Sequence, residues 1–191
     1  STENALGKIE TYNNHMKRLF TKWNLTGINE ETGLHGEIRD EAHAIEAILG
    51  SLEGDTKSGL KSQLLLLTIR RAEKDYIQRL NGKYASLLRQ SVDDLKQLSL
   101  SSFSASTNQA IQTHLINYQE AFDKFVEVRT DILADESVMR DEAFEIVKSI
   151  EGLRNTTLKR IAEHDEEVNN LRAIYSYVAF GTVLVTGIIV I

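Results

Sequence analysis

Basic side chains on or beside apolar helical stripes are the residues of this sequence with the clearest capacity to bind a ligand. A guanidinium buried without a partner is costly, so each one needs an acidic residue, an anionic ligand or access to water. Guanidinium groups also bind carboxylates through two parallel hydrogen bonds. The pattern therefore predicts a site for a small carboxylate. The candidate residues are Arg39, Arg70, Arg71, Lys74, Arg129 and Arg154.

The segment TIRRAEKDYIQR carries the densest group of these candidates. Arg71 follows Leu60, Leu64 and Leu67 at helical spacing, and Arg70 lies beside it. Residues three or four positions apart share one face of a helix. The spacing therefore predicts that Arg71 lies on an apolar face.

Three further arginines occupy comparable positions on other stripes. Arg129 follows Phe125 at helical spacing, Arg154 follows Ile150, and Arg39 borders the stripe of the second helix. If turns near residues 54 and 135 form the tip of a bundle, Arg39 lies roughly 20–25 Å below that tip. Arg71 lies at the same depth, and Arg154 lies roughly 25–30 Å below the tip. Three helices would then present arginines to one carboxylate.

A purely structural interpretation is open for each of these basic side chains. Salt bridges to acidic neighbours would satisfy an arginine without any ligand. The candidate acidic partners are Glu37, Asp40, Glu73, Asp75 and Glu151.

No catalytic or metal-binding motif accompanies the basic residues. The sequence contains no nucleophile elbow, phosphate-binding loop or HExxH motif. His43 and His164 lie on charged helical segments, where an isolated histidine is usually solvated or bonded locally. We therefore expect no catalytic residue, no metal and no cofactor, and we do not expect an enzyme.

The composition favours long helices and argues against a nucleic-acid partner. The 191 residues include no proline, so nothing locks φ or removes a backbone donor inside a helix. Cysteine is also absent, which excludes disulfides and thiolate metal sites. The formal net charge of −6 lacks the basic excess that is typical of nucleic-acid binders.

Turn residues divide the polar part of the chain into helical stretches that would position the basic residues. Asn81-Gly82 is a weak point in the third stretch, and residues 99–107 are Ser-rich and predict a loop. Asp135 to Ser137 predicts a short turn with capping residues. We expect an all-α fold of up-and-down antiparallel helices in four-helix-bundle modules. The expected helices cover about 4–25, 30–52, 56–98, 111–133 and 138 onward.

An apolar run near the end of the chain predicts the start of a transmembrane helix. Residues 173–191 contain no charge and end in AFGTVLVTGIIVI. A spanning helix requires about 20 apolar residues, and aromatics such as Tyr175 and Tyr177 favour its interface. The alternative is a buried C-terminal core helix. We expect residues 1–172 to form a domain outside the membrane and the span to be truncated.

Three segments resemble the sensor region of bacterial methyl-accepting chemotaxis proteins of the helical bimodular type. They are TGLHGEIRDEAHAIEAIL at 32–49, LLLLTIRRAEKDYIQRLNGKY at 64–84 and YQEAFDKFV at 118–126. RRAEKDYIQR resembles the family pattern RR-x-EKDF-x-x-R. The segments keep the family order and together span about half of the chain.

This resemblance implies two stacked four-helix modules outside the cytoplasmic membrane that recognise small molecules. The known ligands are organic acids and, in some members, amines. The motif carries a ligand-binding role over to Arg70, Arg71, Lys74 and Arg79. The chain is shorter than a usual two-module sensor, so we expect part of the first helix to be missing.

The leading hypothesis is a periplasmic ligand-binding domain of a chemotaxis transducer in the inner membrane. It would bind a small molecule, with a carboxylate favoured over an amine, and relay a helix displacement across the membrane. We expect a homodimer. The alternatives are the sensor domain of a histidine kinase or cyclase, and a helical protein-interaction domain.

Overall fold

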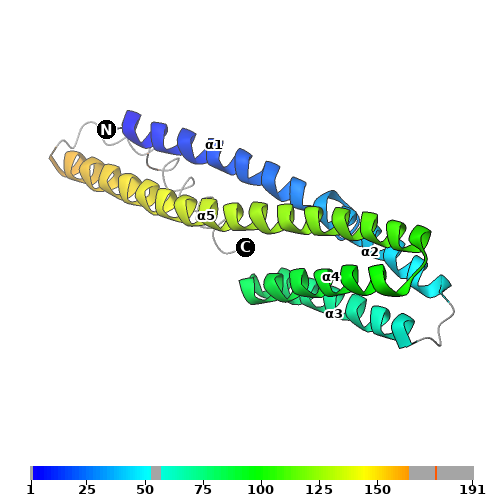
Figure 1. Cartoon of the computed structure of the whole chain (residues 1–191). Helices are drawn as coiled ribbons and strands as arrows, with labels where there is room; N and C mark the ends of the chain where they lie inside the picture. Colours follow the sequence, from blue (N-terminus) through cyan, green and yellow to red (C-terminus); the bar gives the residue numbers. More distant parts are fainter. Residues whose placement is uncertain (1, 53–56, 164–174, 176–191) are drawn as a thin grey trace. The chain divides into compact units, whose positions relative to one another are not determined.

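Five α-helices account for almost all of the described residues in the computed structural model (Figure 1). The structure describes residues 2–52, 57–163 and 175. No strand occurs among them, so the prediction of an all-α fold is confirmed for this part of the chain. The helices are α1 Thr2–Thr26, α2 Gly33–Ser51, α3 Lys57–Arg79, α4 Gly82–Ser102 and α5 Ala105–Glu163.

The chain divides into two compact units. Unit 2 runs from Lys22 to Asp131 and contains α2, α3, α4, the end of α1 and the first part of α5. Unit 1 combines residues 1–21 with residues 132–191, and its described helices are the start of α1 and the second part of α5.

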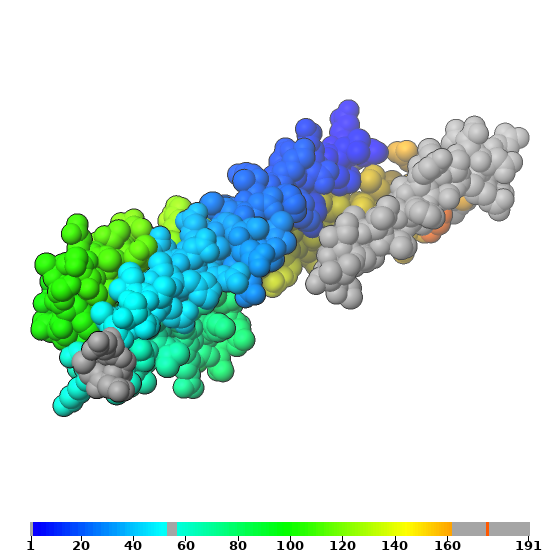
Figure 2. Space-filling model, turned by 90° about the vertical axis from the view of Figure 1, so that its right-hand side faces the viewer, coloured from blue at the N-terminus to red at the C-terminus, as the bar shows by residue number. Residues whose placement is uncertain are grey.

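Unit 2 is a four-helix bundle, because each of its main helices contacts the next one in a closed ring. α2 packs on α3, and α3 packs on α4. Arg89 of α4 pairs with Asp123 of α5 at 2.7 Å, and His114 of α5 bonds to Glu41 of α2 at 2.6 Å. In the space-filling view, cyan α2 lies directly against teal α3 (Figure 2).

The core of this bundle is built from one apolar face of each helix. Apolar residues at helical spacing form a stripe that is removed from water when the helices pack. Each buried side chain of this size stabilises the fold by about 1.5–3 kcal/mol relative to its exposed state. The largest fully buried side chains of the bundle are Ile38, Ile45, Leu49, Ile69, Leu88, Leu95, Ile111, Leu115, Tyr118 and Phe122.

Two glycines shape the loop that joins α1 to α2. Gly27 has φ +102° and Gly33 has φ +57°, which are conformations that a side chain disfavours. A Cβ on Gly27 would also lie 1.9 Å from the backbone oxygen of Thr32. The path of the loop into α2 therefore depends on these two glycines. α2 begins at Gly33, three residues later than the sequence predicts.

The predicted weak point at Asn81-Gly82 is a helix boundary. α3 ends at Arg79, and Leu80 adopts a left-handed conformation with φ 49°. The side chain of Asn81 then accepts a hydrogen bond from the backbone N–H of Lys83 at 3.0 Å and caps α4. The single helix predicted for 56–98 is therefore two helices.

The Ser-rich loop predicted for residues 99–107 is mostly helical. α4 continues to Ser102, and only Phe103 and Ser104 separate it from α5. Serine hydroxyls remain in the helix by bonding back to carbonyls of the preceding turn, as Ser101 does to Gln97 at 3.3 Å. Ser104 caps α5 by accepting the backbone N–H of Thr107 at 3.2 Å.

The predicted turn at Asp135 to Ser137 is wrong. α5 passes through these residues without interruption and contains 59 residues. Asp and Ser cost less than about 0.7 kcal/mol each inside a helix, and no glycine or proline adds to that cost. Cap-forming residues alone therefore do not end this helix. The depth assigned to Arg154 relied on this turn and is also wrong.

The prediction that Arg71 lies on the buried apolar face of its helix is wrong. Leu60, Leu64 and Leu67 are exposed, and the side chain of Arg71 is 87% exposed. The run of leucines at 64–67 contains several possible helical stripes, and the bundle buries the one that includes Leu66. The buried residues of α3 are Gly59, Ser62, Leu66, Ile69, Ala72, Glu73 and Tyr76.

Unit 1 contains an antiparallel pair of helices. Lys8 of α1 lies 3.2 Å from Glu145 of α5, and His15 lies 2.7 Å from Glu142. A residue later in α1 thus pairs with a residue earlier in α5, so the two helices run in opposite directions. Their shared buried side chains are Ala5, Leu19, Met139, Ala143 and Ile146.

The predicted transmembrane helix at 173–191 lies outside the described residues, apart from Tyr175. Among the helices that the structure describes, none has the length and hydrophobicity needed to cross a membrane.

Candidate functional site

A pocket in unit 2 collects three of the predicted basic residues between α2 and α3. Its volume is about 200 Å³. α2 contributes Arg39, and α3 contributes Arg70 and Lys74. A pocket for a drug-sized ligand measures about 300–1,000 Å³, so this one is suited to a smaller molecule. We call it the cationic pocket; its lining residues are Glu30, His35, Arg39, Arg70, Glu73, Lys74, Ile77 and Gln78.

The inner wall of the cationic pocket is a buried carboxylate with two donors. Glu73 has a side chain that is only 7% exposed. Its Oε2 atom accepts a hydrogen bond from the Nη1 group of Arg70 and another, at 2.6 Å, from the hydroxyl of Tyr118. The three residues belong to α3 and α5, so this triad ties the pocket to the long helix.

The environment of the triad disfavours ionisation of its tyrosine. Tyr118 is buried in the bundle. Burial, together with the negative charge and hydrogen bond of Glu73, raises the pKa of Tyr118 well above its usual value. Tyr118 therefore stays protonated and acts as a donor to Glu73.

The charges of Arg39 and Lys74 are the least compensated in the pocket. Among the described residues, Arg39 pairs only with Glu31, at 3.4 Å, and that carboxylate is itself exposed. Lys74 forms no ion pair with any residue that the structure describes. Arg70 is already paired with Glu73. An incoming carboxylate would therefore meet two available cations, with Arg70 as a third that is shared.

His35 is the remaining ionisable group of the pocket wall. Its ring stacks on Phe125 of α5 with centroids 4.9 Å apart and an angle of 6°. Burial, followed by the positive charge of Arg129, lowers the pKa of His35, while Glu73 and Glu30 partly offset this effect. The ring is therefore neutral at pH 7.

Arg71 and Arg79 do not line the cationic pocket. Both pair with Asp75 on α3, at 3.9 Å and 3.4 Å, and both are largely exposed. Arg79 also lies over the ring of Tyr84 at 5.7 Å from its centroid. Salt bridges within the protein therefore account for these two arginines without a ligand.

Arg129 and Arg154 are also placed away from the wall of this pocket. The guanidinium of Arg129 lies over the ring of Trp23 at 4.2 Å, which is a cation–π contact. Its Nη1 atom is buried and has no hydrogen-bond partner among the described residues. Arg154 belongs to the part of α5 in unit 1 and is exposed.

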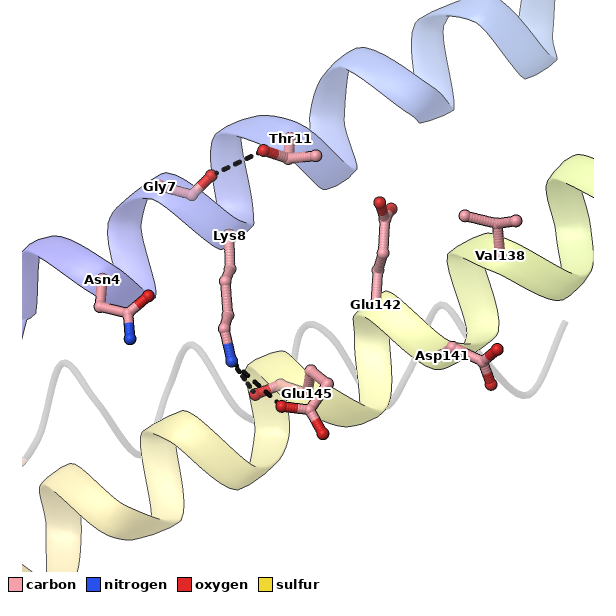
Figure 3. A pocket seen from close by; sticks show the side chains of 8 residues that line it. All are labelled: Asn4, Gly7, Lys8, Thr11, Val138, Asp141, Glu142 and Glu145. Atoms are coloured by element: carbon pink, nitrogen blue, oxygen red, sulfur yellow. Dashed lines mark hydrogen bonds and ion pairs between the residues drawn. The ribbon is translucent and has the colours of Figure 1, made fainter.

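Unit 1 contains a larger and more open groove between α1 and α5 (Figure 3). Its volume is about 650 Å³. Its acidic side chains come from α5, and the amine of Lys8 reaches from α1 to Glu145. We call it the acidic groove; its lining residues are Asn4, Gly7, Lys8, Thr11, Val138, Asp141, Glu142 and Glu145.

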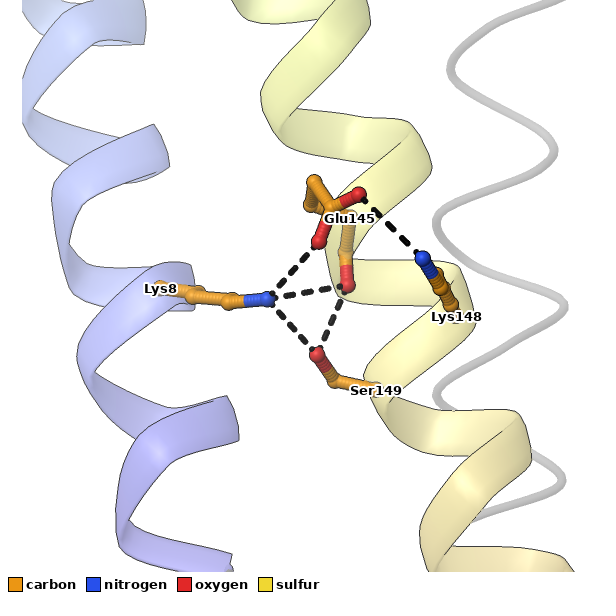
Figure 4. A network of polar contacts seen from close by, with 4 residues as sticks. All are labelled: Lys8, Glu145, Lys148 and Ser149. Carbon is orange, nitrogen blue, oxygen red and sulfur yellow. Dashed lines mark hydrogen bonds and ion pairs between the residues drawn. The ribbon is translucent and has the colours of Figure 1, made fainter.

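The polar contacts of the acidic groove form a small network around Lys8 (Figure 4). The Nζ group donates to Glu145 at 3.2 Å and to the hydroxyl of Ser149 at 3.0 Å. Lys148 approaches the other oxygen of Glu145 at 4.0 Å. The side chain of Glu145 is 50% exposed, so water screens these charges.

The described residues contain no group of three or more His, Asp or Glu side chains arranged to hold a metal ion. His43 is exposed and bonds to Glu46 at 3.1 Å on the same helix. His164 lies outside the described residues.

Comparison of this chain with protein-family models, with curated proteins and with solved structures finds no match. Arguments about its function therefore depend on the residues and their geometry.

Sequence reasoning missed five of the eight residues that line the pocket, and Glu73 and His35 are the two that matter most for its charge. Glu73 was considered only as a salt-bridge partner, although its spacing from Ile69 and Tyr76 places it on the buried stripe of α3. That spacing could have identified it. His35 lies next to buried Leu34 on α2, but nothing in its sequence neighbours indicates a pocket.

Proposed function

We propose that this chain is the ligand-binding domain of a chemotaxis transducer and that its ligand is a small organic acid. The observation that carries the proposal is the cationic pocket, where Arg39, Arg70 and Lys74 surround a small volume between two helices. Arginine and lysine recognise carboxylates through charge-assisted hydrogen bonds. The local positive charge contrasts with the net charge of −6 for the whole chain.

The ligand would act by favouring one packing arrangement of the bundle. A ligand shifts a conformational equilibrium only through different affinities for the two states. A carboxylate that bonds to Arg70 competes with Glu73, and Glu73 is bonded to Tyr118 of α5. α5 is continuous to Glu163, so a displacement would be carried along one helix toward the expected membrane span at 173–191. In this proposal the pocket would lie in the periplasm and the anchor in the inner membrane.

A thermal-shift screen of the chain against small carboxylates, amino acids and amines tests this proposal. A ligand at a hundred times its dissociation constant adds about 2.7 kcal/mol of stability. We expect a carboxylate to stabilise the wild-type chain and to lose this effect in Arg39→Ala and Lys74→Ala. Arg71→Ala is the matched control, because its side chain is exposed and does not line the pocket.

Other results of this screen would contradict parts of the proposal. Stabilisation by an amine alone would exclude the cationic pocket as the site. Equal losses in Arg71→Ala and Arg39→Ala would mean that general surface charge, and not this pocket, attracts the anion. A folded chain that no small molecule stabilises would favour the protein-interaction alternative.

Homodimerisation belongs to the same proposal. Both units expose large apolar side chains that a second copy would cover: Leu64 and Leu67 are each 63% exposed in unit 2, and Phe144 is 69% exposed in unit 1. Sedimentation equilibrium would measure the association. Loss of the dimer in Leu67→Glu would assign the interface to unit 2, loss in Phe144→Glu would assign it to unit 1, and a wild-type monomer would exclude the dimer.

The output domain distinguishes the proposal from its closest alternative. The same bundle could precede a histidine kinase or a cyclase instead of a chemotaxis signalling helix. The sequence of the cytoplasmic part would discriminate between them, because a long methylation-helix coiled coil differs from a kinase domain.

A further inference from the structure

His35 combines a place in the wall of the cationic pocket with a buried, unpartnered ring nitrogen. It is one of the residues that line the pocket. Its Nε2 atom is buried and has no hydrogen-bond partner among the described residues. Native proteins rarely leave such an atom unsatisfied, and a water, an ion or a functional role explains most exceptions. The parallel stack on Phe125 holds the ring in this place.

The other ring nitrogen determines what protonation would do. The ring forms a hydrogen bond with the backbone of Asn29. Because Nε2 has no partner, Nδ1 makes this bond, and the neutral ring then keeps an unshared electron pair on Nε2. A neutral His35 therefore adds no positive charge to the pocket, whereas a protonated His35 adds one.

Charged groups from every neighbouring element act on this ring. Burial and the positive charges disfavour its proton, and the carboxylates favour it. A carboxylate in the pocket would add a further negative charge beside the ring. This charge would offset the effects of burial and of the positive charges on the pKa of His35. The groups that face His35 or share its pocket are Glu30 of the loop, Arg39 of α2, Arg70, Glu73 and Lys74 of α3, and Arg129 of α5.

We propose, on the basis of the function proposed above, that His35 is a proton-dependent specificity residue of the cationic pocket. It would bind a carboxylate more tightly in mildly acidic than in mildly alkaline solution. Proton uptake by His35 and anion binding would then favour each other, as linked equilibria require.

The direction of the effect follows from the state of the empty pocket. The pKa of His35 lies below its ordinary value of 6.5, so the ring is neutral at pH 8. A bound anion raises that pKa, and the protein takes up a proton when the ligand binds in mildly acidic solution. The gain in affinity is therefore present at low pH and lost as the pH rises through the pKa of the bound state.

Calorimetric titration of the whole chain with oxalate at pH 5.5 and pH 8.0 tests the inference. Oxalate is small and stays almost completely ionised over this range, so its own charge does not produce the difference. We expect binding to be about tenfold tighter at pH 5.5 than at pH 8.0, which is within the usual range of coupling between linked sites. His35→Gln should remove most of this difference.

His43→Gln is the matched control for the variant. His43 lies on the same helix but is exposed and bonds to Glu46, so its loss should leave the pH dependence unchanged. An NMR titration of the His35 ring in the wild-type chain, with and without oxalate, gives a second measurement that needs no substitution. The pKa should be higher with oxalate bound.

The outcomes separate this inference from the proposed function. Equal oxalate affinity at both pH values, or full pH dependence in His35→Gln, would overturn the role of His35 and leave the anion site intact. An unchanged ring pKa on binding would do the same. A helical chain that binds no oxalate at either pH would overturn both the inference and the cationic pocket as an anion site.

Discussion

The cationic pocket of unit 2 and the acidic groove of unit 1 both contain ion pairs, but they differ in how those charges are held. In unit 2, Glu73 is only 7% exposed and is bonded to Arg70 and to Tyr118. In unit 1, Glu145 is 50% exposed and is bonded to Lys8 at the rim of a larger opening. A buried carboxylate depends on every donor around it, whereas an exposed one exchanges protein partners for water.

This difference supports the proposal that unit 2, and not unit 1, recognises a ligand. Desolvated charges with fixed partners discriminate between ligands, because a wrong ligand leaves a buried group unsatisfied. Exposed charges attract ions without selecting among them. We therefore place selective binding in unit 2 and treat the network around Lys8 as support for the α1–α5 pair.

Removal of the buried carboxylate is the strongest test of the comparison. Glu73→Ala leaves Arg70 and the hydroxyl of Tyr118 without their acceptor. Loss of one partner from a buried ion pair costs about 3–5 kcal/mol, and the partial exposure of Arg70 favours the lower end of that range. Urea unfolding should show a loss of about 3 kcal/mol.

Glu145→Ala is the matched variant in unit 1. It also removes one carboxylate from an ion pair, here between α1 and α5, but an exposed pair contributes less than about 1 kcal/mol. Equal losses for Glu73→Ala and Glu145→Ala would mean that the two regions do not differ in the way that burial implies.

A smaller effect is expected when only the neutral donor of the triad is removed. Tyr118→Phe retains the buried ring but deprives Glu73 of one of its two hydrogen bonds. A hydrogen bond to a charged group contributes about 1.5–3 kcal/mol, and Arg70 still holds the carboxylate, so we expect a loss of about 1.5 kcal/mol in urea unfolding. Tyr84→Phe serves as the control, since the hydroxyl of Tyr84 has no hydrogen bond to any described residue. A Tyr118→Phe chain as stable as the wild type would show that Arg70 alone satisfies Glu73.

The sequence predicts the elements of both regions better than it predicts their side-chain directions. Apolar spacing identifies an all-helical chain. The turn residues Asn81 and Gly82 locate the break between α3 and α4, because their effect on the backbone is local. The prediction fails at Asp135 to Ser137, where cap-forming residues are present but α5 continues. Local propensity is a weak constraint once two helices can pack.

In the candidate site, too, the sequence does not predict in which direction a single side chain points. Arg39, Arg70 and Lys74 do line one pocket, whereas Arg71 lies on the exposed face of its helix. The run of leucines at 64–67 allows more than one buried stripe, and only the packing of α3 against its neighbours selects among them. A difference of one residue rotates a helix face by about 100° and decides whether an arginine meets a pocket or water.

Acidification should destabilise the fold through His35, with a smaller effect than the substitutions in the triad. The folded pKa of His35 lies below 6.5, so the unfolded chain binds more protons than the folded chain as the pH falls below that value. Stability therefore decreases through this group from pH 7 toward pH 5. His35→Gln should reduce the decrease measured by urea unfolding, and His43→Gln should not. An unchanged pH dependence in His35→Gln would contradict this assignment.

The smallest expected effect belongs to the exposed pair of unit 1. A double-mutant cycle of Lys8→Met and Glu145→Gln isolates their interaction from the bond that Lys8 makes with Ser149. The coupling energy should be about 0.5 kcal/mol at low ionic strength. It should fall toward zero in 1 M salt, where the screening length is about 3 Å. A coupling above about 1.5 kcal/mol that persists in salt would show that the pair is desolvated. The acidic groove would then resemble the cationic pocket in the way it holds its charges, and selective binding could no longer be assigned to unit 2 on the basis of burial.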